Sequence, residues 1–409
     1  MFYCIIGNCE VDLWGVPHVE RIRKILARVG NFIEVEDINK CSREDHILVL
    51  RADYLYEVNV IKKLVEHSQA ILLSSDDSQI PVAIWASGDK LQNSIKYLSA
   101  DVAPQSIENL SIVTPQNLTG GYDPRLRKYD ISHVVNINAQ DQKVIENYLY
   151  DKSYKGITDF VTKWFWPIPA RWVVRACAKK SITPNMVTSV GWLLTIISGI
   201  MFYMGEFFLG ICSAWIMTFL DTVDGKLARV TLQSSKLGHI MDHGLDIVHP
   251  PIWYWCWAMG LATSYLSFAT YTLSVMTWVW IMLAAYIAGR VFEGLFQLFF
   301  NDISIFCWRP IDSYHRLITA RRNPCLIILT LSILFVKPEI GFILVVIWTV
   351  ISSAWLAIRF LYACLYRMIN GRLTSWISHV NPNSPNPDMA SKIFTGYPAQ
   401  KTIEPILRS

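Results

Sequence analysis

The pattern of hydrophobic and polar positions changes character near residue 180. Residues 1–150 carry interspersed charges and short apolar runs, such as Ile47-Leu48-Val49-Leu50 and Ala70-Ile71-Leu72-Leu73. Such runs are typical of buried strands in a soluble α/β domain. From about Val187 onward, long apolar stretches alternate with short basic segments. Because a membrane-spanning helix needs about 20 apolar residues, the pattern predicts a soluble α/β head followed by an α-helical membrane bundle.

Six membrane spans can be placed in the second part of the chain. They are expected near 187–204, 206–227, 239–262, 269–298, 325–336 and 340–362. The domain limits that follow are 1–150 for the α/β domain, 151–186 for an interfacial linker helix, 187–365 for a six-helix transmembrane domain and 366–409 for a C-terminal tail.

The linker mixes aromatic and basic residues. Segment 157–180 holds Trp164, Phe165, Trp166 and Trp172 together with several lysines and arginines. This composition favours a helix lying on the membrane surface, interrupted at Pro167 and Pro169. A plain connecting segment is the alternative interpretation.

Lysine and arginine mark one side of the membrane. They gather before the first span, in the 228–238 turn, after the fourth span and in the tail, whereas the alternate connections are nearly bare. By the positive-inside rule, the basic connections, the head and both termini are expected in the cytoplasm. The first 30 residues are too charged for a signal peptide. We therefore expect a multi-pass integral membrane protein, placed in the inner membrane if the source is bacterial.

Composition narrows the classes of function only slightly. The formal net charge of +4 over 409 residues gives no case for nucleic-acid binding. The nine cysteines form no CxxC pair and show no zinc-ligand spacing, so reduced, packed thiols are expected.

Four aspartates carry the strongest chemical signal. Asp221 and Asp224 are three residues apart in one predicted helix, and Asp242 and Asp246 are four apart in the next. Either spacing places a pair on one helical face, and a short turn makes the two helices antiparallel neighbours. Four converging carboxylates would repel one another unless cations neutralise them, and Mg²⁺ or Mn²⁺ suits hard oxygen ligands. Two such ions favour displacement at phosphorus.

Small and basic residues accompany the aspartates. Gly225 would allow a ligand to approach the helix backbone, Arg229 could hold a phosphate, and Ala228 and Gly238 let helices pack closely. One alternative is that the aspartates form buried ion pairs, but Lys226 and Arg229 are too few cations for four acids. A second alternative is a carboxylate-lined transporter, although no inverted repeat is visible.

The order Asp221-x-x-Asp224-Gly225-x-x-Ala228-Arg229, eight residues, Gly238-x-x-x-Asp242-x-x-x-Asp246 resembles the signature of the CDP-alcohol phosphotransferase (CDP-alcohol phosphatidyltransferase) family. The resemblance covers roughly 157–365. It implies that the upstream turn Thr183-Pro184-Asn185 and the signature residues Gly225, Ala228, Arg229 and Gly238 hold the CDP moiety. It also implies that Asp221, Asp224 and Asp242 bind two metal ions, and that Asp246 touches the metal site and deprotonates the acceptor hydroxyl.

The implied reaction transfers a phospho-alcohol group, in the first interpretation phosphatidyl from CDP-diacylglycerol, to a polar alcohol with release of CMP. Such a reaction belongs to phospholipid biosynthesis. CDP-polyol-dependent synthesis of a soluble or lipid phosphodiester is the alternative. We expect membrane lipids as partners and a homodimer as the assembly.

Five arginines outside the signature are candidates for binding the acceptor or a phosphate. Arg290 lies in the fourth predicted span, and the others follow it: Arg309, Arg316, Arg321 and Arg322. A topology signal combined with contact to anionic lipids is an equally good interpretation of the connection.

The head resembles a sugar-phosphate nucleotidyltransferase whose chemistry is lost. Arg51-Ala52-Asp53 follows a strand-like run, where that family places a metal-binding aspartate, and Asn136-Ile137-Asn138 stands in place of an Asp-Ile-Asp pair. The phosphate-loop region, 6–12, has one glycine, no lysine and two acids. We therefore expect an inactive head.

Overall fold

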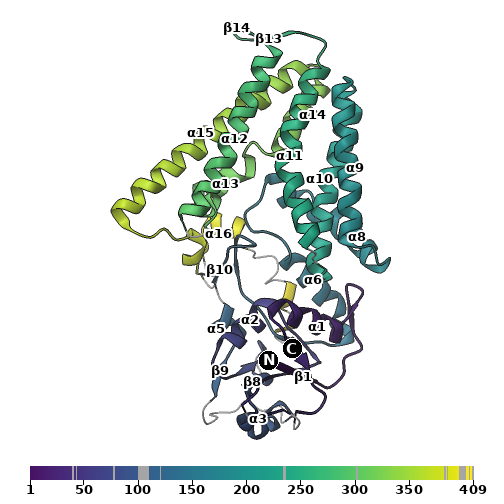
Figure 1. The fold of residues 1–409 in the computed structure, drawn as a ribbon, viewed down its shortest axis with the longest axis vertical. Coiled ribbons are helices and arrows are strands. Elements are labelled where there is room, and N and C mark those ends of the chain that lie inside the picture. The colour runs from purple at the N-terminus through teal and green to yellow at the C-terminus, as the bar shows by residue number, and fades with distance from the viewer. Residues whose placement is uncertain are drawn as a thin grey trace.

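The structure is a computed structural model with a head at one end and a helical bundle extending from it; both marked chain ends lie in the head (Figure 1). It describes residues 1–38, 41–42, 44–76, 79–99, 110–119, 121–233, 236–300, 303–381, 384, 386–395, 402–404 and 406–407.

A six-stranded mixed sheet forms the centre of the head. Its strand order is β4 (Ile33–Glu34), β1 (Phe2–Ile6), β5 (His46–Arg51), β8 (Pro81–Ser87), β7 (Ala70–Leu73) and β9 (Ser111–Val113). Strands β4, β1 and β5 run parallel to one another, β8 runs antiparallel to both its neighbours, and β7 and β9 are parallel.

Side chains alternate between the two faces of this sheet, as a strand requires. Leu48 and Leu50 of β5 face helices α1 (His18–Val29) and α2 (Val58–Glu66). Ile47 and Val49 face the opposite side, where α3 (Gly88–Ser94) and α4 (Lys96–Ser99) pack. Both faces are therefore buried, which explains why these strands read as continuous apolar runs.

Shorter elements complete the head. Two-stranded ribbons pair β2 (Asp12–Leu13) with β3 (Val16–Pro17), β6 (Tyr54–Leu55) with β12 (Val135–Asn136), and β10 (Gly121–Asp123) with β11 (Lys128–Asp130). The head also contains helices α5 (Pro115–Thr119) and α6 (Gln142–Lys152). A 3₁₀ turn, Ala139–Asp141, precedes α6.

The linker forms two helices, α7 (Phe160–Trp164) and α8 (Pro167–Lys179). The predicted break occurs at Phe165-Trp166, because Pro167 and Pro169 lie in the first turn of α8, where proline is tolerated. Helix α8 buries Val174 and Cys177 and leaves Ile168 and Trp172 exposed.

The described residues then form the helices of the bundle: α9 (Pro184–Tyr203), α10 (Phe207–Val230), α11 (Lys236–Gly260), α12 (Val275–Phe299), α13 (Pro310–Ile318), α14 (Arg322–Leu334) and α15 (Pro338–Asn370). Among the described residues, α9, α10, α12 and α15 are each long and apolar enough to cross a membrane, and α13 with α14, bent by 42°, make a fifth candidate. The protein is of the integral membrane type. The six predicted spans are not confirmed, because α11 is not among the candidates found in the described residues. In addition, α14 alone, at 13 residues, is about 20 Å long against a hydrocarbon core of about 30 Å.

The predicted span 269–298 is wrong at its start. Residues Tyr265–Phe268 (β13) and Tyr271–Ser274 (β14) pair as an antiparallel hairpin at the end of the bundle farthest from the head (Figure 1). Helix α12 begins only at Val275, where the Ser274 hydroxyl accepts a hydrogen bond from the Thr277 amide at 3.1 Å. The aromatic and β-branched residues of the hairpin look like the beginning of an apolar span but pair as strands.

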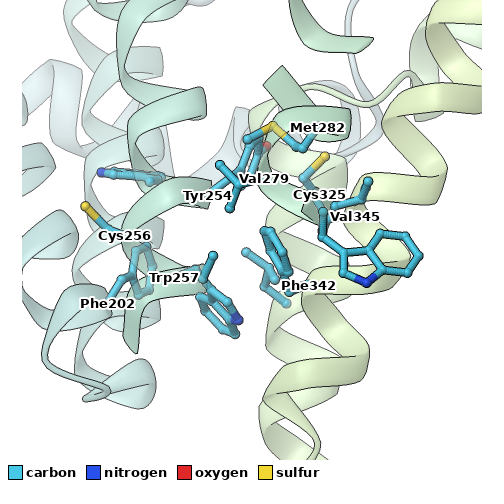
Figure 2. Close-up of a cluster of buried hydrophobic side chains, with 14 of the residues drawn as sticks. Phe202, Tyr254, Cys256, Trp257, Val279, Met282, Cys325, Phe342 and Val345 are labelled. Atoms are coloured by element: carbon cyan, nitrogen blue, oxygen red, sulfur yellow. The ribbon is translucent and has the colours of Figure 1, made fainter. Parts of the chain in front are cut away.

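The bundle has its own apolar core. Phe202 of α9 packs against Trp257 of α11, and Met282 of α12, Cys325 of α14 and Phe342 of α15 fill the same cluster (Figure 2). The core joins α9, α10, α11, α12, α14 and α15.

Residues beyond α15 return to the head. The 3₁₀ turn Trp376–His379 and helix α16 (Met389–Phe394) pack near α13 and the β10–β11 ribbon. Ile403 and Ile406 then enter an apolar cluster shared by the head and the bundle. The predicted tail is therefore packed against the protein where the structure describes it.

Candidate active site

The C-terminal half of α10 carries the first part of the signature. Asp221, Asp224, Gly225 and Ala228 recur at intervals of three and four residues, so they form one stripe along the helix. Helix α11 follows after a short turn and carries Asp246. Gly238 and Asp242 also belong to α11, but their side-chain positions lie outside the described residues.

Asp224 is held by the helix that precedes it. Its carboxylate is buried and accepts a hydrogen bond of 2.6 Å from the Thr188 hydroxyl of α9. The same hydroxyl donates to the Pro184 carbonyl at 3.0 Å. Thr183 caps α9 through the Met186 amide, and Asn185 is exposed beside it. The upstream turn is thus connected to the aspartate stripe.

Arg322 joins the two signature helices. One of its terminal nitrogens donates to Asp221 Oδ2 at 2.5 Å, and the other donates to Asp246 Oδ1 at 3.0 Å. The sequence interpretation considered Lys226 and Arg229 as counter-ions, whereas the structure brings this arginine from α14. Asp221 and Asp246 therefore converge on one cation.

Gly225 and Arg229 are one helical turn apart. A Cβ atom built at Gly225 would lie 3.2 Å from Arg229 Nη2, which is tighter than an ordinary van der Waals contact. The absent side chain therefore leaves room for the guanidinium along the helix.

The other candidate arginines separate into two places. Arg290 and Arg321 both pair with the partly buried Glu293 of α12, Arg290 at 3.2 Å. Arg316 is buried, and its guanidinium and that of Arg321 lie over the Phe306 ring at 5.5 and 5.3 Å. Arg309 is elsewhere, over the rings of Trp308 and Tyr366 at 5.2 and 5.1 Å.

Sequence reasoning missed a polar contact between α14 and the linker. Asn323 follows Arg322, and its amide donates to Asp159 Oδ1 at 2.9 Å and to the Thr162 hydroxyl at 3.2 Å. Asp159 is also the N-cap of α7. The sequence signal for this contact was a polar residue between Arg322 and Pro324, close to the start of a predicted span.

In the head, the two segments singled out from the sequence lie together. Arg51 donates to both carboxylate oxygens of Asp53, at 3.1 and 2.8 Å, and the Asn136 amide lies 3.4 Å from the same carboxylate. The pairing of β6 with β12 brings them together. Asp53 therefore already has a cationic partner, the guanidinium of Arg51 at the end of β5.

Comparison with known proteins places this geometry in a family. The model of the family described as CDP-alcohol phosphatidyltransferase matches residues 181–355. Over these residues the chain is similar to the CDP-alcohol phosphatidyltransferase family. The matched segment of the phosphatidyltransferase domain begins at the turn before α9 and ends within α15.

Curated relatives match over shorter stretches. Archaetidylinositol phosphate synthase of Pyrococcus horikoshii is 37% identical over 79 residues, which are 19% of this chain and 42% of that protein. Cholinephosphotransferase 1 of Xenopus laevis is 28% identical over 123 residues, 27% of this chain and 29% of that protein. The chain thus spans less than half of the length of either relative.

A solved structure of phosphatidylinositol phosphate synthase from Mycobacterium tuberculosis, with CDP-DAG bound, is also similar. It is 19% identical and has a TM-score of 0.32, covering 47% of this chain and 92% of that one. The same enzyme in complex with manganese and citrate gives a TM-score of 0.33 at 17% identity, with coverages of 55% and 99%.

Proposed function

We propose that the phosphatidyltransferase domain transfers a phospho-alcohol group from a CDP-activated donor to an alcohol acceptor and releases CMP. The observation that carries this proposal is the complete signature, spaced over two helices whose carboxylates Asp221 and Asp246 meet at Arg322. The match of residues 181–355 to the family model supports it.

Four carboxylates would hold the divalent ions, Mg²⁺ or Mn²⁺: Asp221, Asp224, Asp242 and Asp246. Their chemistry fits, because hard oxygen ligands at high charge density favour such ions. The convergence of Asp221 and Asp246 on the Arg322 guanidinium supports the fit, since the two oxygens already share one cation. When bound, the ions would neutralise charge on the diphosphate of the donor. The manganese complex of the mycobacterial synthase is consistent with this assignment.

Asp246 would act as the base. Its side chain is about half exposed, at 48%, and accepts a hydrogen bond from Arg322 at 3.0 Å. The carboxylate takes the proton of the acceptor hydroxyl while the acceptor oxygen forms a bond to the phosphorus that bears the transferred alcohol. The phosphoanhydride bond to the cytidylyl phosphate breaks, and CMP leaves with that bond's electron pair.

The upstream turn and the Gly225–Arg229 segment would hold the nucleotide half of the donor. The Asp224–Thr188–Pro184 chain of contacts supports this proposal, because it fixes the turn beside the carboxylates. Arg229, lying along Gly225, would offer its guanidinium to a phosphate.

An apolar cavity supports a lipid-linked donor. It measures about 470 Å³ and lies between α11 and α12, beginning at Ile247, the residue after Asp246, and reaching Trp255 and Ile287. An acyl chain fits such a lining better than a polyol does. CDP-diacylglycerol is therefore the favoured donor, and the CDP-polyol is the alternative.

The arginines around Glu293 support a polar, anionic acceptor. Arg290 and Arg321 share one carboxylate, and Arg316 is buried nearby with its Nε and one Nη atom lacking a hydrogen-bond partner among the described residues. Buried guanidinium groups require compensation, which a phosphate or a polyol could supply. We propose that this site, with the head, lies on the cytoplasmic side, and the basic connections support this orientation.

The direct test is CMP release. Purified protein with CDP-diacylglycerol, Mg²⁺ and a panel of alcohols, with and without a phosphate group, should release CMP, and EDTA should stop it. Asp246→Asn should lower the rate by about a hundredfold or more, whereas the exposed helix cap Asp388→Asn should retain it. No CMP from either a lipid or a polyol donor, together with ion or solute flux in proteoliposomes, would establish the transporter instead.

A further inference from the structure

Helix α10 has a second stripe on the face opposite the aspartates. Val223, Lys226, Leu227 and Val230 recur at intervals of three and four residues and are all buried. Each lies two residues from a member of the aspartate stripe, and two residues correspond to about 200° around a helix. The back of the catalytic helix is therefore covered.

The head provides much of that cover. Val223, Leu227 and Val230 belong to one apolar cluster with Trp14, which comes from the β2–β3 ribbon, and with Tyr148 and Tyr150 of α6. Gly15 lies directly against helix α8, because a Cβ atom at this position would be 2.9 Å from the Ala178 carbonyl oxygen. The head and α10 share a single core.

Arg21 of α1 completes the contact at the end of α10. Its side chain is 4% exposed, and Nη1 donates to the Val230 carbonyl at 2.5 Å, across 209 residues of sequence. Val230 is the last residue of α10. A guanidinium at this position satisfies a terminal carbonyl and opposes the negative end of the helix dipole.

Lys226 makes the second polar contact. It lies within the signature, between Gly225 and Ala228. It donates to the Ser153 carbonyl at 3.2 Å and lies 3.5 Å from the centre of the Tyr154 ring. The contact ties the signature turn of α10 to the segment that follows α6.

We propose that the head is a positioning support for the catalytic helix and that Arg21 is a positioning residue for the transferase reaction. This inference rests on the proposed function. Arg21 touches no reacting atom; it fixes the height and rotation of α10 and thereby the placement of Asp221, Asp224 and Arg229. An inactive nucleotidyltransferase-like head would keep its fold for this purpose.

The test compares two arginines of α1 in the full chain. Arg21→Met removes the guanidinium but keeps most of the apolar stem. Arg23→Met is the matched control, because Arg23 is exposed and pairs with Glu34 at 3.0 Å on the surface of the head. We would measure kcat and KM for CMP release and, separately, hydrogen exchange of the amides in 222–231 and in α12.

For Arg21→Met we expect kcat to fall about tenfold with KM for the donor changed less than about threefold, because misplacement of catalytic groups lowers turnover. Amide exchange in 222–231 should accelerate, while exchange in α12 and the thermal midpoint stay close to those of Arg23→Met. Arg21→Lys should restore at least half of kcat.

Unchanged kcat and unchanged exchange in Arg21→Met would overturn the proposal. Equal acceleration of exchange throughout the molecule would also overturn it, since that result describes general destabilisation. If the wild-type protein releases no CMP but exchange still accelerates only in 222–231, the proposed function fails while the support of α10 by the head stands.

Discussion

At the scale of single residues, Asp221 and Asp246 meet at Arg322, from which 101 and 76 residues separate them. The spacing within each helix could be read from the sequence, since it depends only on the helical period. Arg322 could be predicted as a candidate but not as the partner of these two acids, because its position depends on how α14 packs against α10. The five candidate arginines looked alike in sequence, yet packing gives them three different environments.

Thr188 provides the first residue-scale prediction. Thr188→Val keeps the shape of the side chain but removes the 2.6 Å hydrogen bond to Asp224. A hydrogen bond to a charged group contributes about 1.5 kcal/mol or more, so kcat should fall about tenfold. Steady-state CMP release would measure it. Thr188→Ser keeps the hydroxyl and should remain within about threefold of wild type; equal losses in both variants would contradict a role for the hydrogen bond.

His18 provides a prediction about pH. Burial lowers its pKa to about 4, and its Nε2 lies 2.8 Å from the Tyr54 carbonyl. The unfolded chain binds a proton near pH 6.5, so the stability held at neutral pH is lost as the pH falls from 6.5 towards 4, by up to about 3 kcal/mol. Burial also lowers the pKa of His133 to about 4.

His18→Gln should therefore remove about half of the loss in thermal midpoint between pH 7.5 and pH 5, measured on the full chain in detergent. The exposed His379→Gln should leave the pH dependence as in wild type. A wild-type midpoint that does not change across this range would show that these histidines are not protonated on unfolding.

At the scale of elements, the apolar runs 47–50 and 70–73 lie in strands β5 and β7, and the long apolar stretches of the second half lie in helices, as their length indicated. The β13–β14 hairpin was not, because its aromatic and β-branched residues continue the apolar pattern of α12. The end of α15 was also missed: it continues to Asn370, beyond the predicted limit of 362. Both errors occur where an apolar pattern ends gradually and contacts with neighbouring elements decide the boundary.

Gly225 provides the prediction at this scale. Gly225→Ala adds a methyl group 3.2 Å from Arg229 Nη2, so the guanidinium must move. If Arg229 holds a donor phosphate, KM for the donor should rise about fivefold or more, equivalent to about 1 kcal/mol of lost binding. Gly294→Ala in α12 is the control, because a Cβ atom there meets nothing within 4 Å. An unchanged KM in Gly225→Ala would indicate that Arg229 does not contact the donor.

At the scale of the whole molecule, the head and the bundle are joined by a core that neither half predicts by itself. The sequence suggested a head, a linker and a membrane domain in succession. Trp14, in the turn between β2 and β3, stacks on Tyr150 and lies below the Arg175 guanidinium of α8. Contacts between residues so far apart along the chain leave no periodic pattern in the sequence.

Trp14→Ala tests this joint. The side chain is 2% exposed, and its removal should cost about 3–5 kcal/mol. Because the core is shared, we expect the unfolding transitions of head and bundle to shift together in calorimetry. Trp172→Ala, 69% exposed on α8, should leave the midpoint near that of wild type. A separate early transition of the head alone would contradict a shared core.

The return of Ile403 and Ile406 to the junction has a consequence for biosynthesis. These two residues enter the same cluster as Leu13 and Trp14, yet they are translated after α15, the last helix of the bundle. At about 5–20 residues per second, the ribosome adds them roughly 10–50 s after residue 150 has been made. The apolar seam of the nascent head would therefore stay unfilled while the helices of the bundle are synthesised, until residues that follow α15 are added.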